Sequence, residues 1–223
     1  MQNILNKKYH NSGNADVLRH VNGIGTILDV GCGVGDNARI LKNAGHRVDG
    51  ITISETELKE ALPFLNAGYL HNLENGLPEK VKENKYDYII CSHVLEHICY
   101  PEKLLNDLQH CLKTDGQLIV ALPNLFHYNS RWKLVKGEFS YQDAGIWDST
   151  HFKWYTYQTG VALLENNGFT VVHKTVTGLL PGNSLFSKIL SKKTSLVIYN
   201  LLKKVSPGLF GYQLLYIATA KQV

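Results

Sequence analysis

The sequence has no long apolar stretch and no paired cysteine motif. A membrane-spanning helix needs about 18 consecutive apolar residues, and no such run occurs. The first residues, "MQNILNKKYHNSGN", also lack the apolar core of a signal peptide. The cysteines show no C-x-x-C spacing, which argues against a zinc framework and favours reduced, mostly buried thiols; they are Cys32, Cys91, Cys99 and Cys111. We therefore expect a cytoplasmic protein.

Net charge is small as well. The chain has 23 basic and 19 acidic residues, and this surplus is too small to indicate nucleic-acid binding unless the cations cluster. They cluster in one place, at 184–205. We find no internal repeat and no low-complexity segment. A chain of 223 residues that is 44% hydrophobic can bury one sizeable core, so we expect a single domain over 1–223.

Short apolar runs alternate with helical patterns along the first two-thirds of the chain. The predicted strands are 26–31, 47–53, 67–74, 86–92, 117–123, 169–178 and 212–220. Helices are predicted at 35–45, from Ser54 to near Pro63, after the 86–92 strand with its end near "HCLKTDG", and at 155–169. The second of these begins with a capping box, in which Ser54 accepts from the Glu57 amide and Glu57 reaches back. This order predicts an α/β fold with a mostly parallel sheet, helices on both faces and ligands at the carboxyl ends of the strands.

Two segments interrupt this alternation. We name 124–150 the cover segment, because it is long, aromatic and expected to fold over the site. Its aromatic residues either stack on a sugar or fill a small core of their own; with one residue beyond it, they are Phe126, Tyr128, Trp132, Tyr141, Trp147 and Trp154. The basic insertion, 184–205, is predicted to be an amphipathic helix. Its apolar residues are Leu185, Phe186, Ile189, Leu190, Leu196, Val197 and Leu201, with Lys188, Lys192, Lys203 and Lys204 elsewhere on the helix.

A glycine-rich turn joins the first predicted strand to its helix. Its spacing is Gly31-x-Gly33-x-Gly35, and Asp36 stands where a dinucleotide-binding G-x-G-x-x-G loop has its third glycine. Asp29 precedes the loop, so carboxylates lie where a pyrophosphate would sit. Anionic side chains disfavour phosphate and suit a ligand that carries a cationic amine and a sulfonium.

These residues resemble a known enzyme family. "LDVGCGVGD" is similar to the first motif of class I S-adenosylmethionine-dependent methyltransferases, and the likeness continues to about residue 175 through "YDYIICSHVLEHICYPEKLLNDLQHCLKTDGQLIVALPN". "PNLFHY" and "DSTHFKWYT" resemble members encoded with glycan-building enzymes and MetW-like proteins. The resemblance implies a Rossmann-like seven-stranded sheet whose last strand is antiparallel. It also implies S-adenosyl-L-methionine as the cofactor.

The resemblance assigns cofactor roles to individual positions. It places the glycine loop around the methionine half of the cofactor, with Ser92 and His93 at the same end. Thr52 stands where the family usually has an acidic residue for the ribose, and cyclopropane fatty-acid synthases are similar there. Asn72 aligns with the residue that faces the adenine amino group, and its side-chain oxygen can accept a hydrogen bond from that group. The loop residues carried over are Asp29, Gly31, Gly33 and Gly35.

A second motif overlaps this region. His93, Glu96 and His97 match the H-x-x-E-H pattern of inverted zinc peptidases, but the motif begins at the end of a strand, where the resemblance implies the cofactor. Quinone-pathway methyltransferases with Glu-x-x-Glu-His here hold a divalent metal, which leaves open a site of His93 and Glu96 with Glu102 or His97. The imidazole in place of the first carboxylate suits hard cations less. We therefore expect no metal.

Methyl transfer to a hydroxyl requires removal of its proton. His151 in "WDSTHFKW" is the candidate base, with Asp148 holding one ring nitrogen, and the alternative is that His151 only anchors the cover segment. His127 and Tyr128 are weaker candidates.

The predicted function is O-methylation of a sugar or another small polar metabolite in glycan biosynthesis. A lipid or quinone acceptor is one alternative, suggested by Thr52 and the basic insertion. A non-catalytic MetW-like subunit that acts through a partner acyltransferase is the other. The basic insertion itself either packs on the sheet, contacts another copy of the chain or lies on an anionic membrane.

Overall fold

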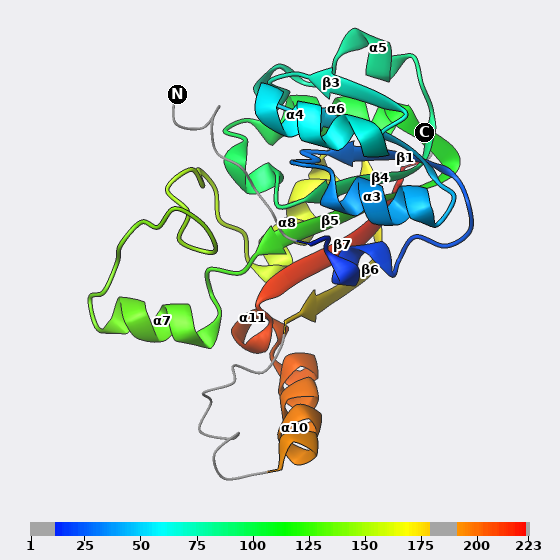
Figure 1. The fold of residues 1–223 in the computed structure, drawn as a ribbon. Coiled ribbons are helices and arrows are strands. Elements are labelled where there is room, and N and C mark those ends of the chain that lie inside the picture. Colours follow the sequence, from blue (N-terminus) through cyan, green and yellow to red (C-terminus); the bar gives the residue numbers. More distant parts are fainter. Residues whose placement is uncertain (1–11, 179–190, 222–223) are drawn as a thin grey trace.

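The computed structural model describes residues 12–178 and 191–221, which fold around a seven-stranded sheet (Figure 1). Across the sheet the strands follow the order β3-β2-β1-β4-β5-β7-β6. Their bounds are β1 Thr26–Val30, β2 Arg47–Thr52, β3 Ala67–Leu70, β4 Tyr86–Ser92, β5 Leu112–Pro123, β6 Phe169–Thr177 and β7 Gln213–Ala220. β7 is antiparallel to both of its neighbours, and the other paired strands are parallel. The predicted sheet with an antiparallel last strand is confirmed.

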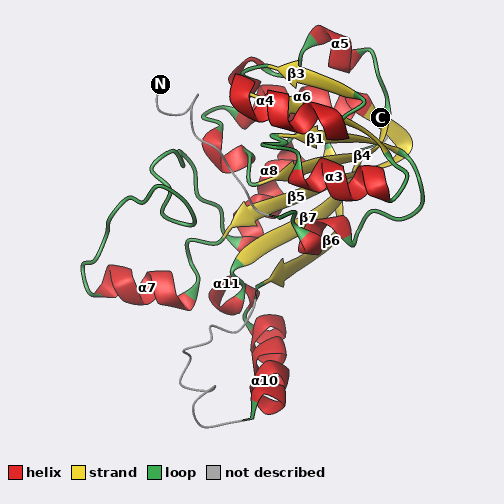
Figure 2. Cartoon of the chain, viewed as in Figure 1, coloured by secondary structure: helices red, strands yellow, loops and turns green. Residues whose placement is uncertain are grey.

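Helices cover both faces of this sheet (Figure 2). α3 packs on one face through Leu41, whereas α6 and α8 pack on the other through Leu105 and Leu164. Leu214 and Leu215, neighbours in β7, belong to these two opposite cores, as the alternation of side chains along a strand requires. The helices flanking the sheet are α2 Ala15–Leu18, α3 Asp36–Asn43, α4 Glu55–Ala61, α5 Glu79–Lys82, α6 Pro101–Cys111 and α8 Tyr157–Asn166, and the short 3₁₀ helices are η1 Leu62–Phe64, η2 Leu73–Asn75 and η3 Leu95–His97.

The carboxyl ends of the parallel strands meet at one edge of the sheet. β1 pairs with β2 and β4 in parallel register, so the loops after these three strands emerge together. Gln213, the first residue of β7, pairs with Pro123, the last residue of β5. Because β7 runs in the opposite direction, its beginning lies at the edge where the parallel strands end. This edge carries the candidate site.

The cover segment extends from this edge and contains α7, Tyr128–Val135. Its residues Leu125, Ile146 and Trp147 form a separate small core, against which Phe126 and Trp154 pack. The side chains of Trp132 and Tyr141 are more than half exposed. Part of the predicted aromatic cluster therefore fills a core of its own.

The helix α10, Lys192–Val205, is the described part of the basic insertion, followed by α11, Pro207–Phe210. Tyr199 is buried and donates a hydrogen bond to the carbonyl oxygen of Phe210, whereas Val197 and Leu201 are exposed. The remaining predicted apolar residues, Leu185, Phe186, Ile189 and Leu190, lie outside the described residues. Among the described helices, none is long and apolar enough to cross a bilayer. Contact of α10 with a membrane or another copy stays a prediction.

Candidate active site

A cavity of about 1040 Å³ lies at the carboxyl edge of the sheet. Its walls come from the loop after β1, the ends of β2, β3 and β4, and the cover segment. Ligands of open α/β sheets bind at this edge. Eight of the predicted site residues line the cavity: Gly31, Gly33, Thr52, Asn72, Ser92, His93, Asp148 and His151. Asp29 and Gly35 do not belong to the lining.

The glycine loop brings backbone directly to the cavity wall. Gly31 has a φ of 72°, and a Cβ atom there would lie 2.5 Å from Cγ2 of Val94. Gly33 has a φ of 53°, in the left-handed region that favours glycine. Gly35 caps α3, and a Cβ atom on it would lie 3.0 Å from the Cα of Ala61. Two of the glycines therefore face the cavity, and the third allows α3 and α4 to pack closely.

Asp29 is a buried carboxylic acid beside this loop. Its side chain is 1% exposed, and its Oδ2 has no hydrogen-bond partner within the part of the chain that the structure describes. Burial raises the pKa of Asp29 to about 7, against the opposing effect of a hydrogen bond from Asn37. A cation bound nearby would lower the pKa of Asp29, because it would stabilise the ionised carboxylate.

Sequence reasoning missed a second carboxylate, Glu57. The Thr52 hydroxyl donates a 2.7 Å hydrogen bond to Glu57 Oε2, and the Ser54 amide donates to the Thr52 hydroxyl at 3.2 Å. Glu57 is only 4% exposed, yet it lines the cavity. The Ser54 side chain does accept from the Glu57 amide, as predicted, but the Glu57 carboxylate turns to Thr52. The short spacing from Thr52 to Glu57 could have suggested that the two side chains meet. The capping-box interpretation instead assigned the Glu57 carboxylate to the start of the helix.

Asn72 caps the 3₁₀ helix η2 at the next strand end. Its Oδ1 accepts a 3.1 Å hydrogen bond from the Glu74 amide. A side-chain amide oxygen has two lone pairs, so it can accept a second hydrogen bond. The predicted role toward adenine is compatible with this geometry.

His93 is held in a strained conformation at the end of β4. Its φ is 58°, which is uncommon for a residue other than glycine, and residues in such conformations cluster at active sites and ligand-binding sites. Its Nε2 lies 2.7 Å from Oε1 of Gln213, and Gln213 in turn donates to the Thr177 hydroxyl. The Ser92 hydroxyl accepts from Asn14 Nδ2 at 3.0 Å. This network holds Ser92 and His93 in place, and no motif in the sequence pointed to Asn14 or Gln213.

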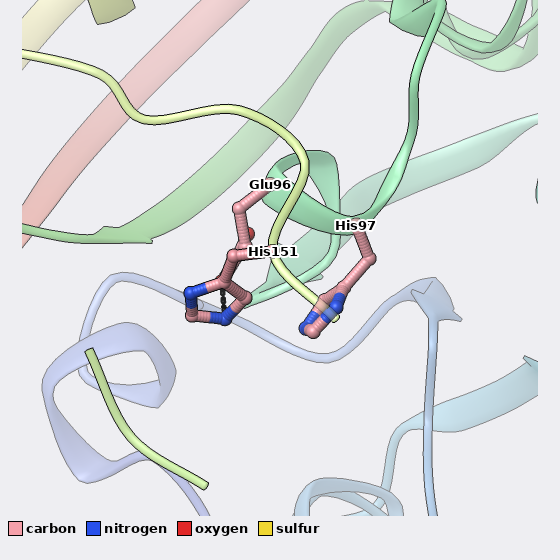
Figure 3. A group of neighbouring side chains, drawn as sticks. All are labelled: Glu96, His97 and His151. Atoms are coloured by element: carbon pink, nitrogen blue, oxygen red, sulfur yellow. Dashed lines mark ion pairs between the residues drawn. The ribbon is translucent and has the colours of Figure 1, made fainter. Parts of the chain in front are cut away.

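Glu96, His97 and His151 form a cluster on the same cavity wall, which we call the Glu–His cluster (Figure 3). Glu96 and His151 point toward each other, with 3.9 Å between Glu96 Oε1 and His151 Nε2. The His97 and His151 rings are in edge contact at 4.6 Å between centroids. Burial lowers the pKa of His151, although Glu96 opposes this effect. This shift favours the neutral form of the His151 ring.

The partners of His151 differ from the predicted pair. Its Nδ1 donates to the carbonyl oxygen of Ile146 at 3.2 Å, and its Nε2 faces Glu96. The Asp148 carboxylate instead accepts from the amide and the hydroxyl of Thr150, at 2.9 and 2.7 Å. Thr150 in turn contacts Nδ1 of His97. Asp148 thus supports His97 through Thr150, and Ile146 and Glu96 orient His151.

The weaker candidates lie away from the cavity lining. Burial lowers the pKa of His127 to about 4, and its Nδ1 accepts from the Asn129 amide at the start of α7. Neither His127 nor Tyr128 lines the cavity, and the same holds for all members of the predicted aromatic cluster. The aromatic side chains that do line it are Tyr100, Phe152 and Tyr212, besides the imidazoles.

Known proteins resemble this chain in sequence and in fold. Over 112 residues it is 31% identical to a ubiquinone biosynthesis O-methyltransferase of Rickettsia canadensis, covering 48% of each chain. Over 102 residues it is 28% identical to phosphoethanolamine N-methyltransferase 2 of Caenorhabditis elegans, covering 44% of this chain but 23% of that protein. The chain thus spans half or less of the length of these two relatives. A SAM-dependent methyltransferase from Archaeoglobus fulgidus has a similar fold, with a TM-score of 0.59 and 22% identity over 88% of this chain and 86% of its own.

The match to a family model covers more of the chain than either relative does. This family is described as a methyltransferase domain, and its model matches residues 11–174. The match includes the glycine loop, Glu57, the Glu–His cluster and all strands of the sheet except β7 and the end of β6. The chain therefore belongs to the methyltransferase domain family, as a Rossmann-like member whose cofactor is S-adenosylmethionine.

Proposed function

We propose that this protein transfers the methyl group of S-adenosylmethionine to a hydroxyl oxygen of a small polar acceptor, such as a sugar in glycan biosynthesis. The observation that carries the proposal is one cavity with two chemically different walls. Glycine backbone and the buried Glu57 carboxylate lie at one wall, and the Glu–His cluster lies at another. The cavity volume of about 1040 Å³ slightly exceeds the usual range for one drug-sized ligand, which leaves room for a cofactor and an acceptor.

The cofactor would lie along the ends of β1, β2 and β3. Gly31 and Gly33 would bring backbone against its methionine half, and Asp29 would favour its cationic amine from beside the loop. Glu57, fixed by Thr52, would accept from the ribose hydroxyls in place of the acidic residue that the family usually has at Thr52. The three other proposed contacts are Asn72 with the adenine, and Ser92 and His93 with the methionine end.

The reaction would be an in-line displacement at the sulfonium methyl group. The protein must align the acceptor oxygen, exclude water and remove one proton from the hydroxyl. We assign the loss of that proton to the Glu–His cluster, which provides a buried carboxylate and two imidazoles on the cavity wall. An amine acceptor would need such a cluster less, so the cluster favours oxygen over nitrogen.

A quinol or another phenol is the second candidate acceptor. The relative that acts in ubiquinone biosynthesis supports it, as do three aromatic side chains on the cavity lining, Tyr100, Phe152 and Tyr212. A lipid-linked acceptor would also account for the exposed apolar residues of α10. The non-catalytic alternative would bind the cofactor without turnover.

The test is methyl transfer from S-adenosylmethionine with a labelled methyl group. The acceptors would be a panel of monosaccharides and nucleotide sugars, a catechol, a quinol and phosphoethanolamine. We expect label in an alkali-stable ether of a sugar hydroxyl, and no label in phosphoethanolamine. Transfer only to the catechol or quinol would overturn the sugar assignment, and transfer to the amine would overturn O-methylation. Cofactor binding without transfer to any acceptor, together with a co-purified enzyme, would favour the non-catalytic alternative.

A further inference from the structure

We propose that Glu96, His97 and His151 bind one divalent transition-metal ion on the cavity wall. One ligand atom from each of the three side chains lies within 4.8 Å of the other two. All three residues also line the cavity, so an ion could enter from it. From the sequence we expected no metal, but the ligands weighed there were a different group that included His93. In the fold, His151, the residue after the cover segment, also faces Glu96, with 3.9 Å between its Nε2 and Glu96 Oε1, and forms a group with Glu96 and His97 (Figure 3).

The Glu96 carboxylate lacks the compensation that a buried charge normally has. Glu96 is 0% exposed, and neither of its oxygens has a hydrogen-bond partner within the described residues. Burial of a carboxylate without compensation costs several kcal/mol, so such groups are normally paired or bound to a metal. Two imidazoles approach this carboxylate, His93 Nδ1 at 3.3 Å and His151 Nε2 at 3.9 Å from Oε1. A cation between Glu96 and His151 would satisfy the charge.

Both imidazoles of the proposed site are held through their Nδ1 atoms. His97 donates from Nδ1 to the carbonyl oxygen of Thr150 at 3.1 Å, and His151 donates from Nδ1 to the carbonyl oxygen of Ile146 at 3.2 Å. A neutral ring that donates from Nδ1 carries its lone pair on Nε2. Metal-binding histidines almost always show such a bond from the other ring nitrogen to a backbone carbonyl or carboxylate, which fixes the tautomer. The Asp148 carboxylate extends this support by accepting from the hydroxyl of Thr150.

The ligand set indicates the kind of ion. Two imidazoles and one carboxylate suit zinc and the neighbouring divalent transition metals, whereas magnesium and calcium prefer oxygen ligands alone. Three protein ligands leave a coordination position open, as in catalytic zinc sites. An acceptor hydroxyl in that position would have a lowered pKa. This step rests on the proposed function: the hydroxyl would lose its proton to solvent water in the cavity, and His151 would act as a metal ligand instead of taking up the proton itself.

The competing arrangement is an ion pair between Glu96 and a protonated His93. Burial lowers the pKa of His93, but Glu96 and the hydrogen bond to Gln213 raise it by more, so the net shift is upward. A protonated His93 would compensate Glu96 without any metal. The two arrangements differ in which histidine the carboxylate needs, and this difference can be measured.

The experiment is titration of chelator-treated, full-length protein with Zn²⁺ by calorimetry, and with Co²⁺ by visible absorption. We expect one ion per chain and weak cobalt d–d bands. Glu96→Gln and His151→Asn should each weaken binding by at least about tenfold. His93→Asn should bind as the parent does, since asparagine tolerates the left-handed backbone of this position. His110→Asn is the matched control on the exposed side of α6.

Several results would overturn the site. The first is no ion binding by the parent, and the second is binding by Glu96→Gln and His151→Asn that is as tight as the parent's. The third is loss of binding in His93→Asn alone, and the last is an intense thiolate-to-cobalt band from a cysteine such as Cys99. A cooperative thermal unfolding transition near that of the parent, measured for each variant in parallel, shows that the fold is intact. Because ion binding is measured without an acceptor, it can fail while methyl transfer is observed, and the reverse. Failure of this site and failure of the proposed function are therefore distinguishable.

Discussion

The hydroxyl of Thr52 donates a 2.7 Å hydrogen bond to the carboxylate of Glu57, and both side chains are buried at the cavity wall. This bond joins the last residue of β2 to the first turn of α4. It directs a carboxylate to the strand end where the resemblance to methyltransferases implies an acidic residue. The structure thus provides, from the helix, the chemistry that the strand lacks.

Glu57 should therefore be needed for cofactor affinity. Glu57→Ala removes a charged acceptor, and hydrogen bonds to charged groups contribute about 1.5–3 kcal/mol, so S-adenosylhomocysteine should bind roughly tenfold to a hundredfold more weakly. Calorimetric titration measures this change. Glu55→Ala is the matched control, because Glu55 begins the same helix and forms an exposed ion pair with Lys59. Equal affinity of Glu57→Ala and the parent would exclude Glu57 from the cofactor site.

Gly33→Val should abolish S-adenosylhomocysteine binding. A side chain at Gly33 would occupy the space where backbone faces the cavity, and its φ of 53° also disfavours valine. Gly23→Val controls for the backbone strain, because Gly23 has a φ of 73° with open space around it and is not part of the cavity lining. Thermal unfolding of both variants with and without ligand separates the two effects. If Gly23→Val lost the ligand response as fully as Gly33→Val, strain alone would explain the result.

Asp29 should make stability depend on pH. Its pKa is raised to about 7 in the folded protein, so the native state keeps a proton that the unfolded state loses near pH 4. The contribution of Asp29 to the free energy of unfolding should therefore fall by up to about 4 kcal/mol as pH rises from about 4 to about 7. Asp29→Asn removes this dependence. Chemical denaturation of both proteins between pH 4 and 8 should show the variant gaining on the parent with rising pH, and a constant difference would contradict the assignment.

His151→Gln should reduce turnover by roughly a hundredfold to ten-thousandfold while cofactor affinity and melting temperature stay near those of the parent. Glutamine can form one hydrogen bond but provides neither a base nor a good metal ligand. Asp148→Asn should cause a smaller loss, because Asp148 acts on the cluster through Thr150 and His97. Steady-state kinetics on the acceptor found by the panel gives both values. Full turnover of His151→Gln, or a variant that melts early, would leave His151 as an anchor of the cover segment.

The fold follows from local patterns, and much of the site does not. The apolar runs at 26–31, 86–92 and 117–123 became β1, β4 and β5, because strands buried on both faces are apolar throughout. The glycine loop was predictable because positive φ values favour glycine. The pairing of Glu96 with His151 depends on how the cover segment returns to the sheet, and no short-range pattern encodes that path. The Glu57 carboxylate likewise bonds to Thr52 in a buried position instead of forming the predicted capping-box bond, and the local sequence does not distinguish these two partners.

The most direct test of the account is calorimetric titration of the parent protein with S-adenosylhomocysteine and, separately, with NAD. The cavity combines glycine backbone with buried carboxyl groups, which suits a cationic sulfonium cofactor and opposes a pyrophosphate. The account predicts micromolar-range binding of one S-adenosylhomocysteine per chain, a higher melting temperature in its presence and no response to NAD. Tight binding of NAD without any response to S-adenosylhomocysteine would contradict it.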